Sequence, residues 1–446
     1  MTQSPATYDN YIADFLRLQE RDGNAPAWLR DLRREAFERF REIGLPAARK
    51  GNEPWKYTNI APITGTSFAY PFPNGARPAM PDVRALAPWH DSWATLAFVN
   101  GRYAPELSRL PALGSVRVMS LARAAVEHED VVRGHLARHA SFKDGGFAAL
   151  NTAFLQDGAF IEAAPDATAA APLHLVFLTA GGNGPLVSHP RTLVRAGRDA
   201  RLTVIESYLG AAGAHYLSNA VSEIVLDEGA QVDHYRLMLD GSDAYHVGLS
   251  RVYQQRDSTL TSMTFASGPA LGRNDFAVLL DAPGASCFLR GLYVTSGSQH
   301  IDNYINIEHA QPHPTSRLYY RGILDDNSRA VFGGMVLVRE GAVKADAYQE
   351  DKNLLLSDKA EVDSKPSLEI YADDVKCGHG ATAGTIADDA MFYMRSRGLD
   401  EQTARVFLIK GFASEVLDAV QPEPLRHWLE EKTMRVLPRF TVEAPA

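Results

Sequence analysis

Cys377 and His379 are the two residues of this 446-residue chain whose types and spacing most clearly suggest chemistry. In an extended strand, side chains two residues apart point the same way, so this thiol and this imidazole would share one face, with Gly378 and Gly380 leaving room beside them. Such a pair could hold a thiophilic metal. Two ligands do not complete a site, because structural zinc takes four and catalytic zinc takes three plus water. Either a partner chain supplies the rest, or the pair belongs to an ordinary core.

Composition defines the setting for this pair. Hydrophobic residues make up 45% of the chain, which supports a well-formed core. The two cysteines cannot build a disulfide framework and indicate a reducing compartment. The first ten residues lack the basic and apolar pattern of a secretory signal, and no apolar run approaches the roughly 20 residues that cross a bilayer. We therefore expect a cytoplasmic protein without a membrane segment.

Charge and motif content exclude several activities. The formal net charge is -9 and the pI is about 5.9, which argues against nucleic acid as the main partner. The Gly-x-x-x-x-Gly-Lys-Ser/Thr sequence of an ATP-binding P-loop is absent, and so is the Gly-x-Ser-x-Gly sequence of a nucleophilic serine. The sequence therefore predicts a protein without a self-contained active site.

An N-terminal helical region is expected over residues 1–90. Between residues 27 and 45, apolar side chains recur every three or four positions, opposite a face of Arg and Glu, which indicates an amphipathic helix. Gly44 and Pro46 end it. A proline-rich segment from Pro71 to Pro88 then separates this region from the rest of the chain.

Residues 91–397 form the expected core, with a mixed αβ lead-in to about residue 150. Short β-type runs follow, and the turns between them share one order: an apolar residue, polar turn residues, a small residue and a second apolar residue. This order occurs in residues 194–202, 225–232, 280–287, 324–331, 356–362 and 371–377. Self-similar turns are typical of a solenoid of stacked β rungs, so we predict a right-handed parallel β-helix rather than a sandwich.

The repeat alignment gives the two cysteines a second interpretation. Cys287 and Cys377 occupy the slot that Val232, Val331 and Val362 fill in other repeats, where an inward apolar side chain is expected. Free cysteine is among the residues most often buried, so packing alone can explain both. The repeat alignment thus favours Cys377 as a core residue.

Residues 398–446 form the expected C-terminal helical region. Asp400 is a suitable N-cap for a helix whose apolar stripe runs from Ala404 to Val420, and a second amphipathic helix follows from Leu425 and ends near Pro438. These helices could cover the last rung of the solenoid, or they could dock another protein.

Two further groups of residues could carry chemistry. The pairs Asp325 with Asp326, Asp373 with Asp374 and Asp388 with Asp389 could serve glycoside cleavage, but each lies in or beside a turn slot, where Asp is favoured for backbone hydrogen bonding. His300, His309 and His313 are spaced by nine and four residues, which does not keep them on one face of a strand. We interpret both groups as structural.

Six segments of the chain form a recognisable set: QHID at 299–302, YRGILDDNSRAVF at 320–332, QEDKNLLL at 349–356, PSLEI at 366–370, DDVKCGHGATAG at 373–384 and FYMRSRG at 392–398. Taken together, they resemble the SufB/SufD family of iron-sulfur cluster assembly scaffolds. EPWKYT at 53–58 is similar to the SufD branch in particular. Members of the SufB branch usually carry more cysteines, so this chain is more similar to SufD.

The resemblance implies a non-catalytic scaffold subunit of a SufBCD complex. It implies pairing with SufB through the β-helix core, docking of the ATPase SufC on the C-terminal helices, and ATP hydrolysis in SufC. His379, and then Cys377, would be ligands of a nascent iron-sulfur cluster or of iron at the SufB interface. It leaves open a homodimer of the isolated chain, flavin on the complex and the point where iron enters. A purely structural subunit and a carbohydrate-active β-helix enzyme are the alternative functions.

Overall fold

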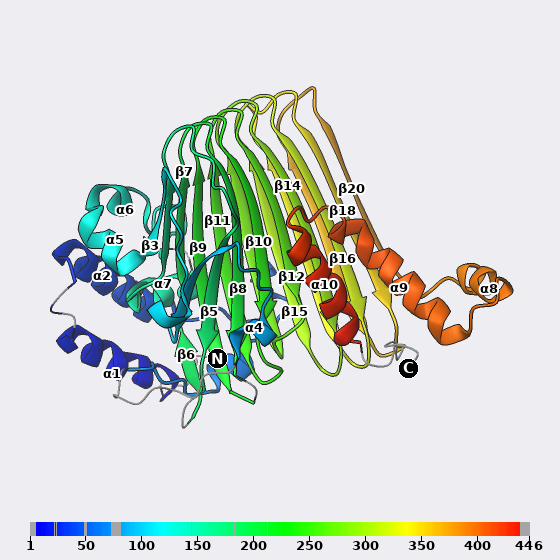
Figure 1. Ribbon diagram of the computed structural model, residues 1–446, viewed down its shortest axis with the longest axis horizontal. Coiled ribbons are helices and arrows are strands. Elements are labelled where there is room, and N and C mark those ends of the chain that lie inside the picture. The colour runs from blue at the N-terminus through cyan, green and yellow to red at the C-terminus, as the bar shows by residue number, and fades with distance from the viewer. Residues whose placement is uncertain are drawn as a thin grey trace.

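The computed structural model describes residues 6–21, 23, 25–48, 51–72, 82–143, 145–181, 184–211 and 213–437. Their centre is a mainly parallel β-solenoid of about eight turns, as predicted from the repeated turns (Figure 1). No helix in these ranges is long and apolar enough to cross a membrane.

The strands of the solenoid form two ten-stranded sheets. Sheet B contains β1 (Ala94–Val99), β2 (Arg102–Tyr103), β5 (Leu173–Thr179), β8 (Arg201–Gly210), β10 (Gln231–Leu239), β12 (Thr259–Ala266), β14 (Ser286–Thr295), β16 (Thr315–Leu324), β18 (Asp346–Leu355) and β20 (Lys376–Gly384). Sheet A contains β3 (Val116–Ser120), β4 (Ala159–Ala163), β6 (Leu186–Ser188), β7 (Arg191–Ala196), β9 (Tyr216–Leu226), β11 (Tyr245–Gln254), β13 (Leu271–Leu280), β15 (His300–His309), β17 (Arg329–Val338) and β19 (Glu361–Ile370).

From β7 onward, consecutive strands alternate between the sheets, so each strand from β7 to β18 pairs with the strand two places further along the chain. Sheet B is ordered β2-β1-β5-β8-β10-β12-β14-β16-β18-β20, and sheet A is ordered β19-β17-β15-β13-β11-β9-β7-β4-β3, with β6 beside β9. The pairing is parallel except for β1 with β2 and β3 with β4. Tight turns make the alternation possible, because Asp199, Asp257, Asp326 and Asp374 adopt positive φ there, a conformation that Asp tolerates better than most residues.

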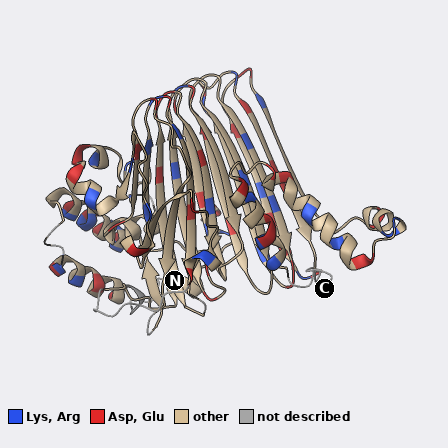
Figure 2. Cartoon of the chain, viewed as in Figure 1, with Lys and Arg blue, Asp and Glu red and all other residues tan. Residues whose placement is uncertain are grey.

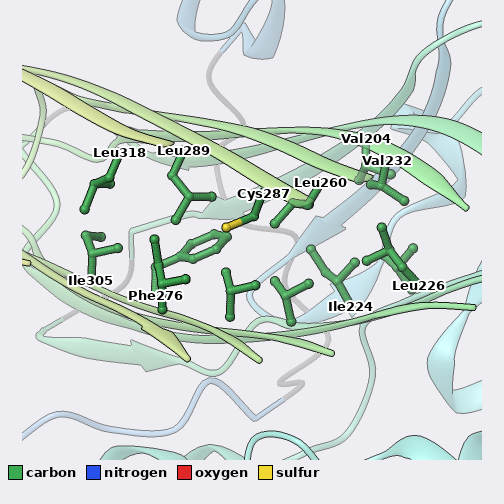
Figure 3. Close-up of a cluster of buried hydrophobic side chains, with 14 of the residues drawn as sticks. Val204, Ile224, Leu226, Val232, Leu260, Phe276, Cys287, Leu289, Ile305 and Leu318 are labelled. Atoms are coloured by element: carbon green, nitrogen blue, oxygen red, sulfur yellow. The ribbon is translucent and has the colours of Figure 1, made fainter. Parts of the chain in front are cut away.

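The interior of the solenoid is an apolar core between the facing sheets. Alternate residues of each strand point into it, as the two-residue period of a strand requires. Figure 3 shows Cys287 among Leu260, Phe276 and Leu289, and its side chain is fully buried. The core assignment of Cys287 from the repeat slot therefore agrees with its place in the fold.

N-terminal helices cover the outer face of sheet A. Helices α1 (Ala6–Arg21), α2 (Ala27–Ile43) and α7 (Gly146–Ala153) pack on β9, β11 and β13, whereas α5 (Leu121–Glu127) and α6 (Glu129–His135) pack on β4 and β7. Short segments complete the region: η1 (Glu53–Trp55), α3 (Ala61–Thr64), α4 (Val83–Leu86) and η2 (Pro105–Leu107). Of the proline-rich segment expected between Pro71 and Pro88, residues 73–81 lie outside the described ranges.

The C-terminal helices cover the outer face of sheet B. Helix α9 (Glu401–Leu417) begins at the predicted cap, where the Asp400 carboxylate accepts a hydrogen bond from the Thr403 backbone. It packs with α10 (Glu423–Arg435) against strands that include β10, β14 and β16. The tail expected after Pro438 lies outside the described residues.

A further helix, α8 (Asp388–Ser396), precedes Gly398, where the sequence led us to expect the helices to begin. It projects beyond the last strands at the end of the solenoid (Figure 1). None of its side chains is buried, so α8 does not bury an apolar face in a core.

Candidate functional site

The candidate site lies on β20, the last strand of sheet B. Its pairing with β18 is parallel, and among the described residues its other edge has no neighbour in the sheet. In the same way, β19 is the last strand of sheet A. No residue of either strand is fully buried, although the strands before them are largely buried. The solenoid thus ends in two exposed edges, the kind of edge to which another strand can add.

Cys377 and His379 share one face of β20, as the spacing predicts. Cys377 lies opposite Ala347 of β18, and His379 lies opposite Gln349, and both of these β18 residues are buried on the interior side of the strand. The pair therefore lies on the side of β20 that continues the interior of the solenoid. Gly378, between them, lies on the other side, beside the Tyr348 ring.

The two side chains differ in exposure. Cys377 is half-buried and packs against the apolar core, and this burial raises the pKa of its thiol. His379 is exposed. A thiol with a raised pKa ionises less readily, and metal ligation requires the thiolate. The imidazole is therefore the more available ligand in the isolated chain.

Cys377 and His379 do not make a metal site by themselves. Within the described ranges, no group of three or more His, Cys, Asp or Glu side chains is arranged to hold a metal ion. The open edge beside Cys377 and His379 leaves space for ligands from a second chain. A soft sulfur and an imidazole are a suitable donor set for iron or an iron-sulfur cluster, but these two residues cannot complete it.

Polar side chains lie on the interior side of β18, the strand that pairs with β20. Asp351 of β18 is fully buried, and it accepts hydrogen bonds from Ser364 Oγ at 2.7 Å, Asn353 Nδ2 at 2.7 Å and the Tyr293 hydroxyl at 3.2 Å. Burial is the main cause that raises the pKa of this carboxyl group to about 6. The interior is therefore apolar around Cys287 and polar around Asp351. Nearer the N-terminal end it also holds a fully buried polar group, Glu206 with His234 and Arg236.

The three histidines of the second candidate group do not meet. His300 and His309 lie at opposite ends of β15, and His313 lies in the following turn with a φ of 61°. His309 is buried beside the Ser316 hydroxyl at 2.8 Å, and burial lowers its pKa to about 4. His300 lies 3.2 Å from the Thr58 hydroxyl of the N-terminal region. The side chains of His300 and His309 therefore have structural partners.

The aspartate pairs also lie apart. Asp325 follows β16 and lies where the chain passes from sheet B to sheet A, whereas Asp373 follows β19 and lies where the chain passes from sheet A to sheet B. These two kinds of turn are at opposite sides of the solenoid, because all the strands involved run parallel. Asp388 and Asp389 stand in the first turn of α8. The positions of Asp325 and Asp373 do not form a shared carboxylate site.

Sequence reasoning missed the residues of β18 that support the site. Gln349 and Asp351 face inward, whereas Glu350 and Lys352 face outward. Both sets are polar, so the alternation of apolar and polar residues that reveals a half-buried strand is absent. Only the parallel pairing of β18 with β20 places these residues next to Cys377 and His379, and the sequence pattern does not reveal that pairing.

Together these features define a class: a β-solenoid with helices on both outer faces, an open last turn and a cysteine and a histidine on one face of its last strand. The SUF system FeS cluster assembly SufBD core domain matches residues 177–412, and the SufBD protein N-terminal region matches residues 7–175. The chain therefore belongs to the SufBD family of iron-sulfur cluster assembly proteins, and the resemblance seen in the sequence is confirmed.

Relatives from other organisms agree with this assignment. The chain is 32% identical to an iron-sulfur cluster assembly SufBD family protein of Synechocystis, over 89% of each chain. It is 31% identical to the iron-sulfur cluster assembly protein SufD of Escherichia coli, over 90% of this chain and 92% of the relative. It is also 24% identical to SufD of Bacillus subtilis, over 93% of this chain and 95% of the relative.

Proposed function

We propose that this chain is the SufD-like subunit of a SufBCD complex, where it supports assembly of a nascent iron-sulfur cluster or acquisition of iron. The observation that carries the proposal is the exposed edge of β20, which presents His379 and Cys377 as part of a ligand set. The subunit would be a non-catalytic scaffold in the cytoplasm, with ATP hydrolysis in SufC. The names and lengths of the relatives support this assignment.

SufB is the proposed partner at the open end. A second solenoid with its own exposed edge could continue one or both sheets through backbone hydrogen bonds, and its side chains could complete the coordination of iron. The same edges would allow two copies of this chain to pair when SufB is absent. His379 is the first proposed ligand, because it is exposed, and Cys377 is the second.

The test of the ligand role is His379→Ala in a complex reconstituted with SufB and SufC. We expect cluster formation, measured from visible absorbance and from bound iron and sulfide, to fall at least about tenfold while the complex elutes intact in size-exclusion chromatography. His427→Ala is the matched control, because His427 is an exposed histidine on α10. If His379→Ala and Cys377→Ala both formed the cluster at the rate of the unmutated protein, neither residue would be a ligand. The purely structural role would then be the remaining function.

SufC is the proposed partner of the C-terminal helical region. Helices α8 and α9 expose Phe392, Tyr393 and Phe407, whose relative exposures are 75%, 56% and 54%. Exposed aromatic side chains on a projecting helix are typical anchors of a protein interface. Deleting everything after Gly398 would be a poor test, because α9 and α10 cover the apolar outer face of sheet B.

Point substitutions test the docking of SufC more directly. We expect the double variant Phe392→Ser and Phe407→Ser to lose co-purification with SufC while it keeps its unfolding temperature, because both side chains are largely exposed. Leu16→Ser is the control, since Leu16 is 56% exposed on α1, far from these helices. Undiminished binding of SufC to the double variant would contradict this docking surface.

A further inference from the structure

Arg321 joins three elements through one guanidinium group. It belongs to β16 and its side chain is 5% exposed. Its Nε and Nη2 atoms donate to Glu415 Oε2 of helix α9 at 2.9 Å and 2.7 Å. Nη2 also donates to Glu350 Oε1 of β18 at 2.6 Å. The group therefore ties helix α9 to two neighbouring strands of sheet B.

A second cation balances the charges of this cluster. Lys352 Nζ lies 3.3 Å from Glu350 Oε1 and 3.8 Å from Glu415 Oε2, so two basic groups face two carboxylates. Burial opposes ionisation of Glu350, but the hydrogen bonds and charges of Arg321 and Lys352 outweigh it and lower its pKa. Figure 2 shows basic and acidic residues interspersed along the C-terminal helices and the nearby strands. The cluster thus joins a buried guanidinium group and a mostly buried carboxylate to two partly exposed side chains, those of Lys352 and Glu415.

The cluster lies next to the strand that carries the candidate ligands. Glu350 is opposite Gly380 of β20, and Gly380 directly follows His379. The chain then links β20 to α8 through residues 385–387, and α8 leads into α9. Helix α9 is therefore connected to β20 twice, by the chain itself and by the ion cluster through β18.

We propose that Arg321 and Glu415 form a latch that fixes α9 on sheet B and thereby limits the movement of β20. With the latch closed, a force on the C-terminal helices is borne by β16 and β18. With the latch open, the same force acts on β20 through the short 385–387 link, and the strand with Cys377 and His379 separates from β18. Arg321 and Glu415 are then positioning residues for His379. The proposal deepens the proposed function, because it names the joint between helix docking and ligand exposure.

The two cysteines provide the readout in the full-length chain. Cys377 is half-buried on β20, and Cys287 is fully buried in the core, so reaction of each thiol with an aromatic disulfide reagent reports a different opening. We expect Glu415→Gln to speed labelling of Cys377 about tenfold, equivalent to ~1.4 kcal/mol of easier local opening. Cys287 should remain protected, because the core is not involved. Identification of the labelled peptide by mass spectrometry separates the two thiols.

Glu401→Gln is the matched control, since Glu401 lies on the same helix and pairs along it with Arg405, at 3.0 Å. Its labelling rate should equal that of the parent. Arg321→Lys should behave like Glu415→Gln, because one ammonium group cannot reproduce the fork that contacts both carboxylates. Combining the two latch substitutions should add no further increase, since either one opens the latch.

Equal Cys377 rates in Glu415→Gln and Glu401→Gln would overturn the proposal. Parallel acceleration at Cys287 would also overturn it, because that result means general loosening of the fold. The labelling experiment needs neither SufB nor SufC. The labelling result can therefore support or contradict the latch even if His379→Ala shows that His379 is not a ligand.

Discussion

The two ends of the solenoid are built differently. At the N-terminal end, β1 is buried over all but one of its residues, and antiparallel strands β2 and β3 close the two sheets. At the C-terminal end, β19 and β20 continue the parallel pattern and then stop, with no buried residue in either strand. Native proteins usually protect long exposed edges. The unprotected edge at one end supports the proposal that another chain pairs with the last turn.

Matched leucines at the centre and at the open end give the largest expected effect. Leu318 is fully buried, whereas Leu368 of β19 is only partly buried against the core. We expect Leu318→Ala to lower the free energy of unfolding by about 2 to 5 kcal/mol, and Leu368→Ala to lower it by less than ~1.5 kcal/mol in the isolated chain. Urea denaturation measures both. Equal losses would show that the last turn is as closed as the centre, and the comparison would fail.

A substitution at Asp351 tests how well the polar interior near the open end excludes water. Because burial raises its pKa from 3.8 to about 6, the folded state binds this proton more tightly than the unfolded state, and its contribution to stability falls as the pH rises from about 4 to 6. Asp351→Asn removes the ionisation. Relative to the parent, we expect the variant to gain about 2 to 3 kcal/mol in unfolding free energy between pH 4 and pH 7.

Urea denaturation at a series of pH values measures that relative gain. The absolute offset between the two proteins also includes the changed hydrogen bonds to Ser364 and Asn353, so the slope is the informative quantity. A difference that is constant from pH 4 to pH 7 would mean that water reaches Asp351 and that its carboxyl group titrates normally.

The smallest expected effect concerns the last strand of sheet A. Lys365 of β19 lies 2.9 Å from Glu53 of the N-terminal segment, and both side chains are more than half exposed. Exposed pairs of this kind contribute little to stability. We expect Lys365→Gln to leave the urea midpoint unchanged, whereas loss of the buried Arg321 contacts should lower it. A clear shift for Lys365→Gln would show that the N-terminal segment braces β19 as firmly as α9 braces β18.

The sequence predicted several elements closely because their signals are local. The helix expected between residues 27 and 45 is α2, and Asp400 caps α9. The repeated turns predicted the solenoid, because each rung must reverse the chain with the same turn chemistry. Helix α1 also carries a stripe that could have been read from the sequence, because Tyr11, Phe15 and Leu18 are buried at helical spacing.

The sequence by itself determined that Cys377 and His379 share a face, because a strand alternates with a period of two. It also gave the family, through segments spread over the matched regions. Only the tertiary structure decided that this strand is the last one of sheet B, that polar Asp351 is buried behind it, and that Arg321 reaches α9. Those facts depend on which strands become neighbours, a long-range outcome of stacking that no local pattern encodes.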